Sequence, residues 1–325
     1  MHSSRALVSR VPVWAWKVLM SQLEPGERRR FNIDPIENVD YHLDLDYVGD
    51  GIRGHRLDVL VPRPPAPALH SSAPASLPVY VYFHGGGWTS GDKQPLTKYC
   101  ASQAQAGMVV VNVNYRMATR FQMGHMLQDA TAALLWVREN IAGYGGDPER
   151  IVLGGDSAGG QIAALVAAAA FHPELAEHYD LEPVLAPEAI RGLVQHCSAV
   201  DFSVVFEKGF IMSLDFVRIL LPGRGRGMSL PHAARFLSPI EWLGPDFPPV
   251  LVTTSERDFF YGANLNFVAE LRRHGVQVDT LIYDRARRNT EHTWQQNYRY
   301  PESQEVYGRL QEFVRQVAPA PHPVV

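Results

Sequence analysis

The feature that most constrains the fold is an alternation of short apolar runs with helical stretches. The runs are rich in β-branched residues, and the stretches between them carry apolar residues at helical spacing. Continuous apolar strands separated by helices are typical of a mostly parallel sheet covered on both faces. We therefore expect an α/β fold in a single domain over 1–325. The predicted strands are 78–83, 108–115, 150–155, 191–200, 249–255 and 276–284, and the predicted helices are 126–140, 157–170, 263–275 and 302–317.

Other segments fall outside this alternation. A hairpin-like pair is predicted at 41–49 and 55–62, and the Pro- and Ala-rich stretch 62–78 predicts a surface loop. A long insertion, 203–247, separates two strands, is rich in aromatic residues and contains a GRGRG sequence that predicts a flexible turn. Together with an N-terminal helix in about 1–40, this insertion is expected to form a helical cap over one end of the sheet.

Composition excludes several classes of protein. The hydrophobic content of 46% allows a large core. The formal net charge of -4 provides no broad basic field, so nucleic acid is not an expected partner. The two cysteines, Cys100 and Cys197, are too few for a disulfide framework and lack the paired spacing of a zinc site. A reducing, cytoplasmic location is therefore expected.

The N-terminal segment is both apolar and basic. Six cationic residues and two glutamates leave a local charge of +4 in 1–30, beside Trp14 and Trp16. Such a segment suits the surface of a membrane. A helix whose aromatic side packs on the rest of the protein is the simpler interpretation. Charged residues and a proline interrupt the apolar run, so stable membrane insertion is not expected.

The stretch IVLGGDSAGG carries the strongest chemical signal. Ser157 stands between a predicted strand and a predicted helix, flanked by Gly155 and Gly159 in the pattern GxSxG. The turn is so tight that larger side chains at the two glycine positions would collide with backbone. A serine at this place, at the N-terminus of a helix and the carboxyl edge of a parallel sheet, is a candidate nucleophile.

A serine nucleophile needs a base held by a third group. The expected order along the chain is serine, acid, histidine. His292 lies between the last strand and the closing helix, whereas His274 resembles a C-terminal helix cap and His322 lies in the tail. Asp258 is preferred as the acid over Glu256, because it lies farther into the loop after strand 249–255.

Hydrolysis also needs donors for the developing oxyanion. The sequence HGGGW, 84–88, follows a predicted strand, and its glycine amides can approach a substrate closely. The backbone N–H of Ala158 completes the set of donors. Asp156 is interpreted as a loop-bracing acid outside the triad, and Asp129 and Asp147 are expected to bond to local backbone.

Two further patterns are weak. His172 and His178 do not match the spacing of a metalloprotease and are expected at an exposed helix end. The GRGRG sequence at 223–227 lacks the strand before it and the GK[ST] after it that a phosphate loop needs.

Together, HGGGW, GDSAGG, the spacing of 34 residues from Asp258 to His292 and the predicted cap resemble the hormone-sensitive-lipase-like esterases. The resemblance covers about 44–317 and implies the α/β-hydrolase fold. It also implies an oxyanion hole formed by the amides of Gly86, Gly87 and Ala158, with His84 bracing the loop. Where many relatives read YRLAPEHPFPAALEDA, this chain reads YRMATRFQMGHMLQDA, so the rim loop at 119–126 departs from the family pattern.

These observations predict a serine carboxylesterase that hydrolyses short- to medium-chain esters through an acyl-enzyme, without metal or organic cofactor. The expected partner is a small-molecule ester, and a homodimer is left open. An aryl formamidase acting on N-formylkynurenine is the alternative, because HGGGW followed by SGDK is similar to sequences of that group. A non-catalytic receptor is disfavoured because His292 is present, whereas the gibberellin receptors of this fold lack the histidine.

Overall fold

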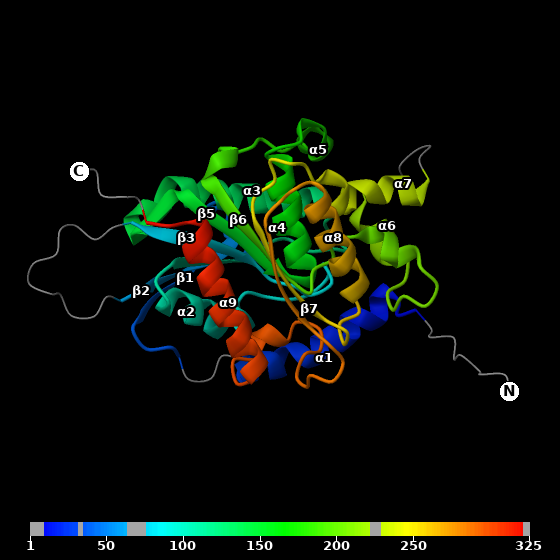
Figure 1. The fold of residues 1–325 in the computed structure, drawn as a ribbon, viewed down its shortest axis with the longest axis horizontal. Coiled ribbons are helices and arrows are strands. Elements are labelled where there is room, and N and C mark those ends of the chain that lie inside the picture. The colour runs from blue at the N-terminus through cyan, green and yellow to red at the C-terminus, as the bar shows by residue number, and fades with distance from the viewer. Residues whose placement is uncertain (1–9, 32–34, 64–75, 222–228, 321–325) are drawn as a thin grey trace, which may run out of the picture.

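The computed structural model describes residues 10–31, 35–63, 76–221 and 229–320 (Figure 1). Within these residues, eight strands form one sheet in the order β1-β2-β4-β3-β5-β6-β7-β8. The first two pairings, β1 with β2 and β2 with β4, are antiparallel, and all the others are parallel. The strands are β1 Val39–Asp46, β2 Arg56–Pro62, β3 Leu77–Phe83, β4 Val109–Val113, β5 Gly146–Asp156, β6 Ile190–His196, β7 Val250–Ser255 and β8 Val278–Tyr283.

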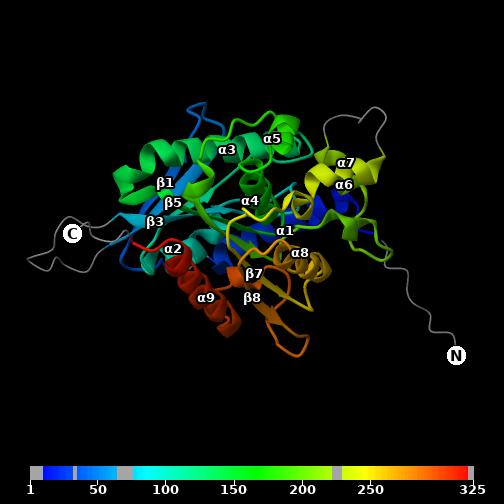
Figure 2. The same cartoon turned by 45° about the horizontal axis from the view of Figure 1, so that its top comes forward.

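Helices cover both faces of this sheet, as expected for apolar parallel strands. Figure 2 shows α3 and α4 on one side of the sheet and α2 and α9 on the other. The helices are α1 Val13–Phe31, α2 Thr97–Gln105, α3 Met123–Asn140, α4 Ser157–Ala169, α5 Pro173–Tyr179, α6 Asp215–Leu220, α7 Leu230–Ala234, α8 Tyr261–Arg273 and α9 Pro301–Val317.

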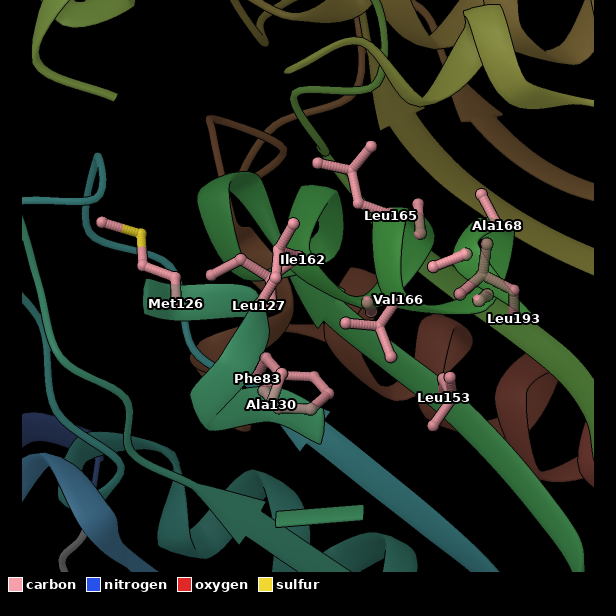
Figure 3. Close-up of a cluster of buried hydrophobic side chains, with 14 of the residues drawn as sticks. Phe83, Met126, Leu127, Ala130, Leu153, Ile162, Leu165, Val166, Ala168 and Leu193 are labelled. Atoms are coloured by element: carbon pink, nitrogen blue, oxygen red, sulfur yellow. The ribbon is translucent and has the colours of Figure 1, made fainter. Parts of the chain in front are cut away.

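The core divides into two layers because neighbouring side chains of a strand point to opposite faces. In β3, Val81 and Phe83 join the layer under α3 and α4, whereas Tyr80 and Tyr82 join the layer under α2 and α9. Figure 3 shows the first layer, in which Leu127 of α3 and Ile162 of α4 lie close to Phe83. The predicted α/β fold with a mostly parallel sheet is therefore confirmed.

Several boundaries differ from the prediction. The helix predicted at 126–140 begins at Met123, where Gln122 and His125 form a capping box. Outside the predicted helical cap, two helices, α2 and α5, are absent from the predicted set. In α2 the polar side chains of Lys98 and Gln103 are buried. The sequence of this helix therefore lacks the division into a polar and an apolar face by which an amphipathic helix is recognised. Helix α5 has only 7 residues, so its few apolar positions do not reveal the 3.6-residue period of a helix.

The N-terminal segment lies beside the long insertion. Val11 forms an isolated parallel bridge with Met212, and Trp16 of α1 meets Phe216 of α6 edge to face at 6.2 Å. Most of the predicted surface loop 62–78, the GRGRG turn and His322 lie outside the described residues. Over the part of the chain that the structure describes, no helix has the length and hydropathy to cross a bilayer.

Candidate functional site

Ser157 stands at the sharp turn from β5 into α4. Its φ angle is 52°, in the left-handed region that non-glycine residues rarely adopt. A side chain at Gly159 would collide with the carbonyl oxygens of Phe83 and His84, so the turn can pack against β3 only with glycine there. The strained turn thus holds the serine hydroxyl at the carboxyl edge of the sheet.

The loops after β7 and β8 bring the predicted acid and histidine to this serine. His292 Nε2 lies 3.0 Å from Ser157 Oγ, and His292 Nδ1 lies 2.7 Å from Asp258 Oδ1. Glu256, the alternative acid, instead accepts a hydrogen bond from the backbone N–H of Arg285 at 2.9 Å. The three side chains therefore form one hydrogen-bonded line from carboxylate to hydroxyl.

The Asp258 carboxylate is fixed by its own partners. Oδ1 also accepts the backbone N–H of Phe260 at 3.0 Å, and Oδ2 accepts the hydroxyl of Thr254 at 3.0 Å. The Asp258 side chain is fully buried, whereas the His292 side chain is 20% exposed. The ring of Phe259 lies 4.0 Å from the His292 ring, centroid to centroid. The imidazole is thus oriented from one side by hydrogen bonds and from another by packing.

The loop that follows β3 faces the same serine. Gly86 and Gly87 have φ angles of 127° and 59°, which place their backbone in conformations favoured by glycine. The hydroxyl of Ser90 donates to the Gly86 carbonyl at 2.7 Å and stabilises the turn. Ala158 is the second residue of α4, where a backbone N–H has no acceptor within the helix.

Asp156 links this loop to the rest of the site. Its Oδ1 accepts the hydroxyl of Tyr82 at 2.5 Å and the backbone N–H of Gly85 at 3.1 Å. Its Oδ2 accepts the side-chain amide of Gln296 at 2.9 Å. Complete burial raises the pKa of Asp156. The sequence offered no signal for Gln296, because a glutamine in a loop has many roles.

His84 begins the loop. Its ring stacks on Tyr115 at 4.5 Å, and its Nδ1 lies 2.7 Å from the carbonyl oxygen of Gly85. The Tyr115 hydroxyl donates to the His84 carbonyl at 2.7 Å. His84 is therefore tied to the loop and, through Tyr115, to the segment that follows β4.

A cavity of about 280 Å³ opens above Ser157 and His292. Glycines of the loop line one part of it, and both polar and apolar side chains line the rest. Two of these side chains, Trp16 and Met20, come from α1, so a segment far from the motifs contributes to the cavity. Further apolar contributors are Pro95, Leu96 and Phe259.

The structure also places Cys197 beside the acid and the histidine. The Cys197 sulfur, an Asp258 oxygen and a His292 nitrogen all lie within 4.8 Å of one another. Both Cys197 and Cys100 are free and buried, and burial raises the pKa of each thiol. Thiol, carboxylate and imidazole are ligand types for metals such as zinc, but here the carboxylate and imidazole hydrogen-bond to each other.

Two expectations hold only in part. Asp129 accepts a backbone N–H, that of Arg116 at 2.8 Å, but this residue is 13 positions away, and the carboxylate also binds the side chains of Arg116 and His55. His172 and His178 lie at the two ends of α5 as expected, but both are half-buried, and His178 stacks on Phe236 at 3.6 Å. In both cases a tertiary contact decides the environment. Asp147 does bond locally, accepting the backbone N–H of Glu149, and His274 lies at the C-cap of α8 as expected.

Comparisons with known proteins agree with this architecture. The chain is 30% identical to Esterase LipQ of Mycobacterium tuberculosis over 72% of its own length and 51% of that protein. It is 48% identical to Carboxylesterase NlhH of the same species, over 28% of this chain and 29% of that protein. The chain thus spans about half the length, or less, of these curated relatives.

Solved structures show the same fold. Esterase B from Lactobacillus rhamnosis superposes with a TM-score of 0.81 at 21% identity, covering 94% of this chain and 95% of that one. An esterase from Pyrobaculum calidifontis superposes with a TM-score of 0.66 at 24% identity, covering 94% of both chains. A family model described as the alpha/beta hydrolase fold matches residues 80–288, more than half of the chain. The chain therefore belongs to the alpha/beta hydrolase fold family that contains the hormone-sensitive-lipase-like esterases.

Proposed function

We propose that the chain is a serine carboxylesterase in which Ser157 is the nucleophile, His292 the general base and Asp258 the group that orients the base. The observation that carries this proposal is the line of hydrogen bonds, 2.7 Å from Asp258 to His292 and 3.0 Å from His292 to Ser157. A neutral imidazole that donates its Nδ1 proton to Asp258 offers a free lone pair at Nε2 to the serine hydroxyl.

In the proposed reaction, Ser157 Oγ attacks the ester carbonyl carbon while His292 Nε2 takes the hydroxyl proton. The bond to the alcohol then breaks, and the imidazolium returns the proton to the leaving oxygen. Water attacks the acyl-serine with His292 again as base, which releases the acid and restores Ser157. The negative oxygen of each tetrahedral intermediate would accept the backbone N–H groups of Gly86, Gly87 and Ala158.

Two side chains would maintain the loop in this scheme. Asp156 accepts the N–H of Gly85, and the ring of His84 contacts the carbonyl of the same residue, so both support the turn that precedes Gly86. No step of the proposed reaction requires a metal ion or an organic cofactor. The free, buried thiols of Cys100 and Cys197 support a reducing compartment such as the cytoplasm.

We also infer that about 1–40 and 203–247 act together as a cap. The bridge from Val11 to Met212 and the contact of Trp16 with Phe216 join the two segments, and Trp16 lines the cavity. A cavity of about 280 Å³ that is bounded on one side by Trp16 favours acyl chains of short to medium length. The names of the relatives, esterases and carboxylesterases, support an ester as the substrate class.

The direct test combines a variant with a trapping reagent. An alkyl p-nitrophenyl phosphonate should release one equivalent of nitrophenol per chain and block ester hydrolysis, because it forms a stable bond to an activated serine. Ser157→Ala should release none and should lose about 10³-fold or more in kcat. Ser90→Ala is the matched control, since Ser90 lines the same cavity without contacting His292, and it should still react with the phosphonate.

A substrate panel tests the class of substrate. p-Nitrophenyl esters from acetate to palmitate are compared with N-formylkynurenine on the same enzyme. The ester rates should peak at about four to eight carbons, where each added CH₂ still gains about 0.8 kcal/mol of burial, and exceed the formamide rate. A formamide rate above the best ester rate would instead identify an aryl formamidase.

A further inference from the structure

Three neighbouring strands bring a third reactive group to the site. Cys197 follows β6, Asp258 follows β7 and His292 follows β8, and these parallel strands are adjacent in the sheet. Because the carboxyl ends of parallel strands meet at one edge, the thiol, the carboxylate and the imidazole converge there. Their donor atoms lie within 4.8 Å of one another. The proposed reaction uses the carboxylate and the imidazole but not the thiol.

The three groups form a ligand set of a recognisable kind. Thiolate sulfur, imidazole nitrogen and carboxylate oxygen are the ligands of Zn²⁺, whereas Mg²⁺ and Ca²⁺ select oxygen ligands. We propose that Cys197, Asp258 and His292 form an inhibitory site for a thiophilic divalent cation such as Zn²⁺ or Cd²⁺. As an account of regulation, the proposal rests on the proposed roles of Asp258 and His292 in ester hydrolysis.

The bound state explains why the cation inhibits. On binding, Cys197 releases its thiol proton to water and His292 binds the cation through Nδ1. The proton of Nδ1 therefore moves to Nε2, so the imidazole keeps one proton but changes tautomer. Nε2–H can no longer take the proton of Ser157 Oγ, which lies 3.0 Å away. Two negative ligands, the thiolate and the carboxylate, balance the charge of the cation.

The geometry also predicts how the cation enters. Nδ1 and Oδ1 are 2.7 Å apart, whereas ligand atoms around a tetrahedral Zn²⁺ lie roughly 3.3 Å or more apart, given bonds of about 2.0–2.3 Å. The His292–Asp258 hydrogen bond must therefore open before the cation is bound. Cys197 is fully buried, while the His292 side chain is 20% exposed and lines the cavity. We expect inhibition to develop slowly, after movement of His292, with cavity water as the fourth ligand.

The test compares three full-length proteins: wild type, Cys197→Ser and Cys100→Ser. The control replaces the other free, buried cysteine, which lies in α2 in the same layer of the core as Cys197 but outside the group that Cys197 forms with Asp258 and His292. Esterase activity is first measured with a chelator present, which tests the proposed function by itself. Residual activity is then followed over time after addition of Cd²⁺, Zn²⁺ or Mg²⁺, and again after the chelator is restored.

Wild type and Cys100→Ser should lose activity slowly with Cd²⁺ and Zn²⁺, retain it with Mg²⁺, and recover with chelator. For the same degree of inhibition, Cys197→Ser should need a Cd²⁺ concentration at least about 10-fold higher than wild type, because it lacks one of the three ligands. Equal sensitivity of Cys197→Ser and wild type would overturn the proposal. So would loss of inhibition in Cys100→Ser alone.

A binding measurement keeps the inference independent of activity. Cd²⁺ added to the wild type should give a thiolate-to-cadmium absorption band in the ultraviolet that is absent from Cys197→Ser. His292→Gln, which need not be active, should show the band only at about 10-fold higher Cd²⁺ or more. If Cys197→Ser does not fold, the same comparison is made with Cys197→Ala. An unchanged band in His292→Gln would exclude the three-ligand site even if the esterase assignment is right.

Discussion

The indole nitrogen of Trp16 lies 3.4 Å from the carbonyl oxygen of Gly86, so helix α1 packs directly on the glycine loop beside Ser157. A side chain at Gly87 would meet the same indole, which shows how closely the two surfaces approach. Trp16 and Met20 both line the cavity, whereas Trp14 on the other side of the helix is 71% exposed. The N-terminal helix therefore contributes a wall to the site from one face.

Replacing Trp16 with alanine should move the optimum of acyl-chain length upward. Removal of the indole enlarges the cavity, and each extra CH₂ that then fits gains about 0.8 kcal/mol, or about fourfold in kcat/KM. The measurement is kcat/KM for p-nitrophenyl esters from butyrate to palmitate. Trp14→Ala is the matched control, since it removes an exposed indole from the same helix and should leave the profile unchanged. Identical profiles for the two variants would mean that Trp16 does not limit chain length.

Asp156→Asn should lower activity more than it lowers stability. The amide can replace one acceptor oxygen, but its NH₂ group must then face another donor, either Gln296 or the Tyr82 and Gly85 pair. The loop before Gly86 should shift, with a loss of about 10²-fold in kcat. Burial raises the pKa of Asp156, so a neutral amide is easier to bury than the carboxylate, which limits the loss of stability. Paired kcat and melting-temperature measurements test this, and an unchanged kcat would contradict the bracing role.

The sequence predicted those parts of the structure that depend on local pattern. Ser157 and its glycines follow from the tight turn, and the strands follow from continuous apolar runs. The order of the motifs also placed His292 and Asp258 in loops that meet at one edge. The approach of Trp16 to Gly86 carries no such signal, because it joins elements 70 residues apart. The side-chain partners of Asp129, Arg116 and His55, were missed for the same reason, because both lie outside the helix that carries Asp129.

Two glycine-to-alanine substitutions should have opposite effects. In Gly159→Ala the added methyl group would collide with the backbone of β3, so we expect loss of the native turn and of soluble, active protein. Gly308 lies exposed within α9, and its added methyl group meets no atom within 4 Å. Gly308→Ala should therefore stabilise the protein by roughly 1 kcal/mol through helix propensity. Urea unfolding and esterase activity are measured for both variants. Equal free energies of unfolding for Gly159→Ala and Gly308→Ala would contradict the packing argument.

His196 should make the protein less stable in mild acid. This side chain is completely buried, and its ring nitrogens lie 2.9 Å from the Tyr99 hydroxyl and 2.7 Å from the Thr253 hydroxyl. Burial lowers its pKa in the folded protein from 6.5 to about 3. Below pH 6.5 the unfolded chain therefore binds a proton that the folded protein excludes, so the stabilising contribution is complete above that pH and falls progressively toward pH 3. Between pH 7.5 and 5.5 this one group should lower the free energy of unfolding by about 1.4 kcal/mol.

The test measures urea unfolding of wild type and His196→Gln at these two pH values. His196→Gln loses packing contacts, so its free energy of unfolding should be lower than that of wild type at both pH values. From pH 7.5 to pH 5.5, however, its free energy of unfolding should fall by about 1.4 kcal/mol less than that of wild type. Other half-buried histidines with lowered pKa values, His172 and His178, act in the same direction, and their contribution cancels in the comparison. If His196→Gln and wild type lose equal stability between pH 7.5 and 5.5, His196 is protonated in the folded protein and the buried site between Tyr99 and Thr253 accepts a charge.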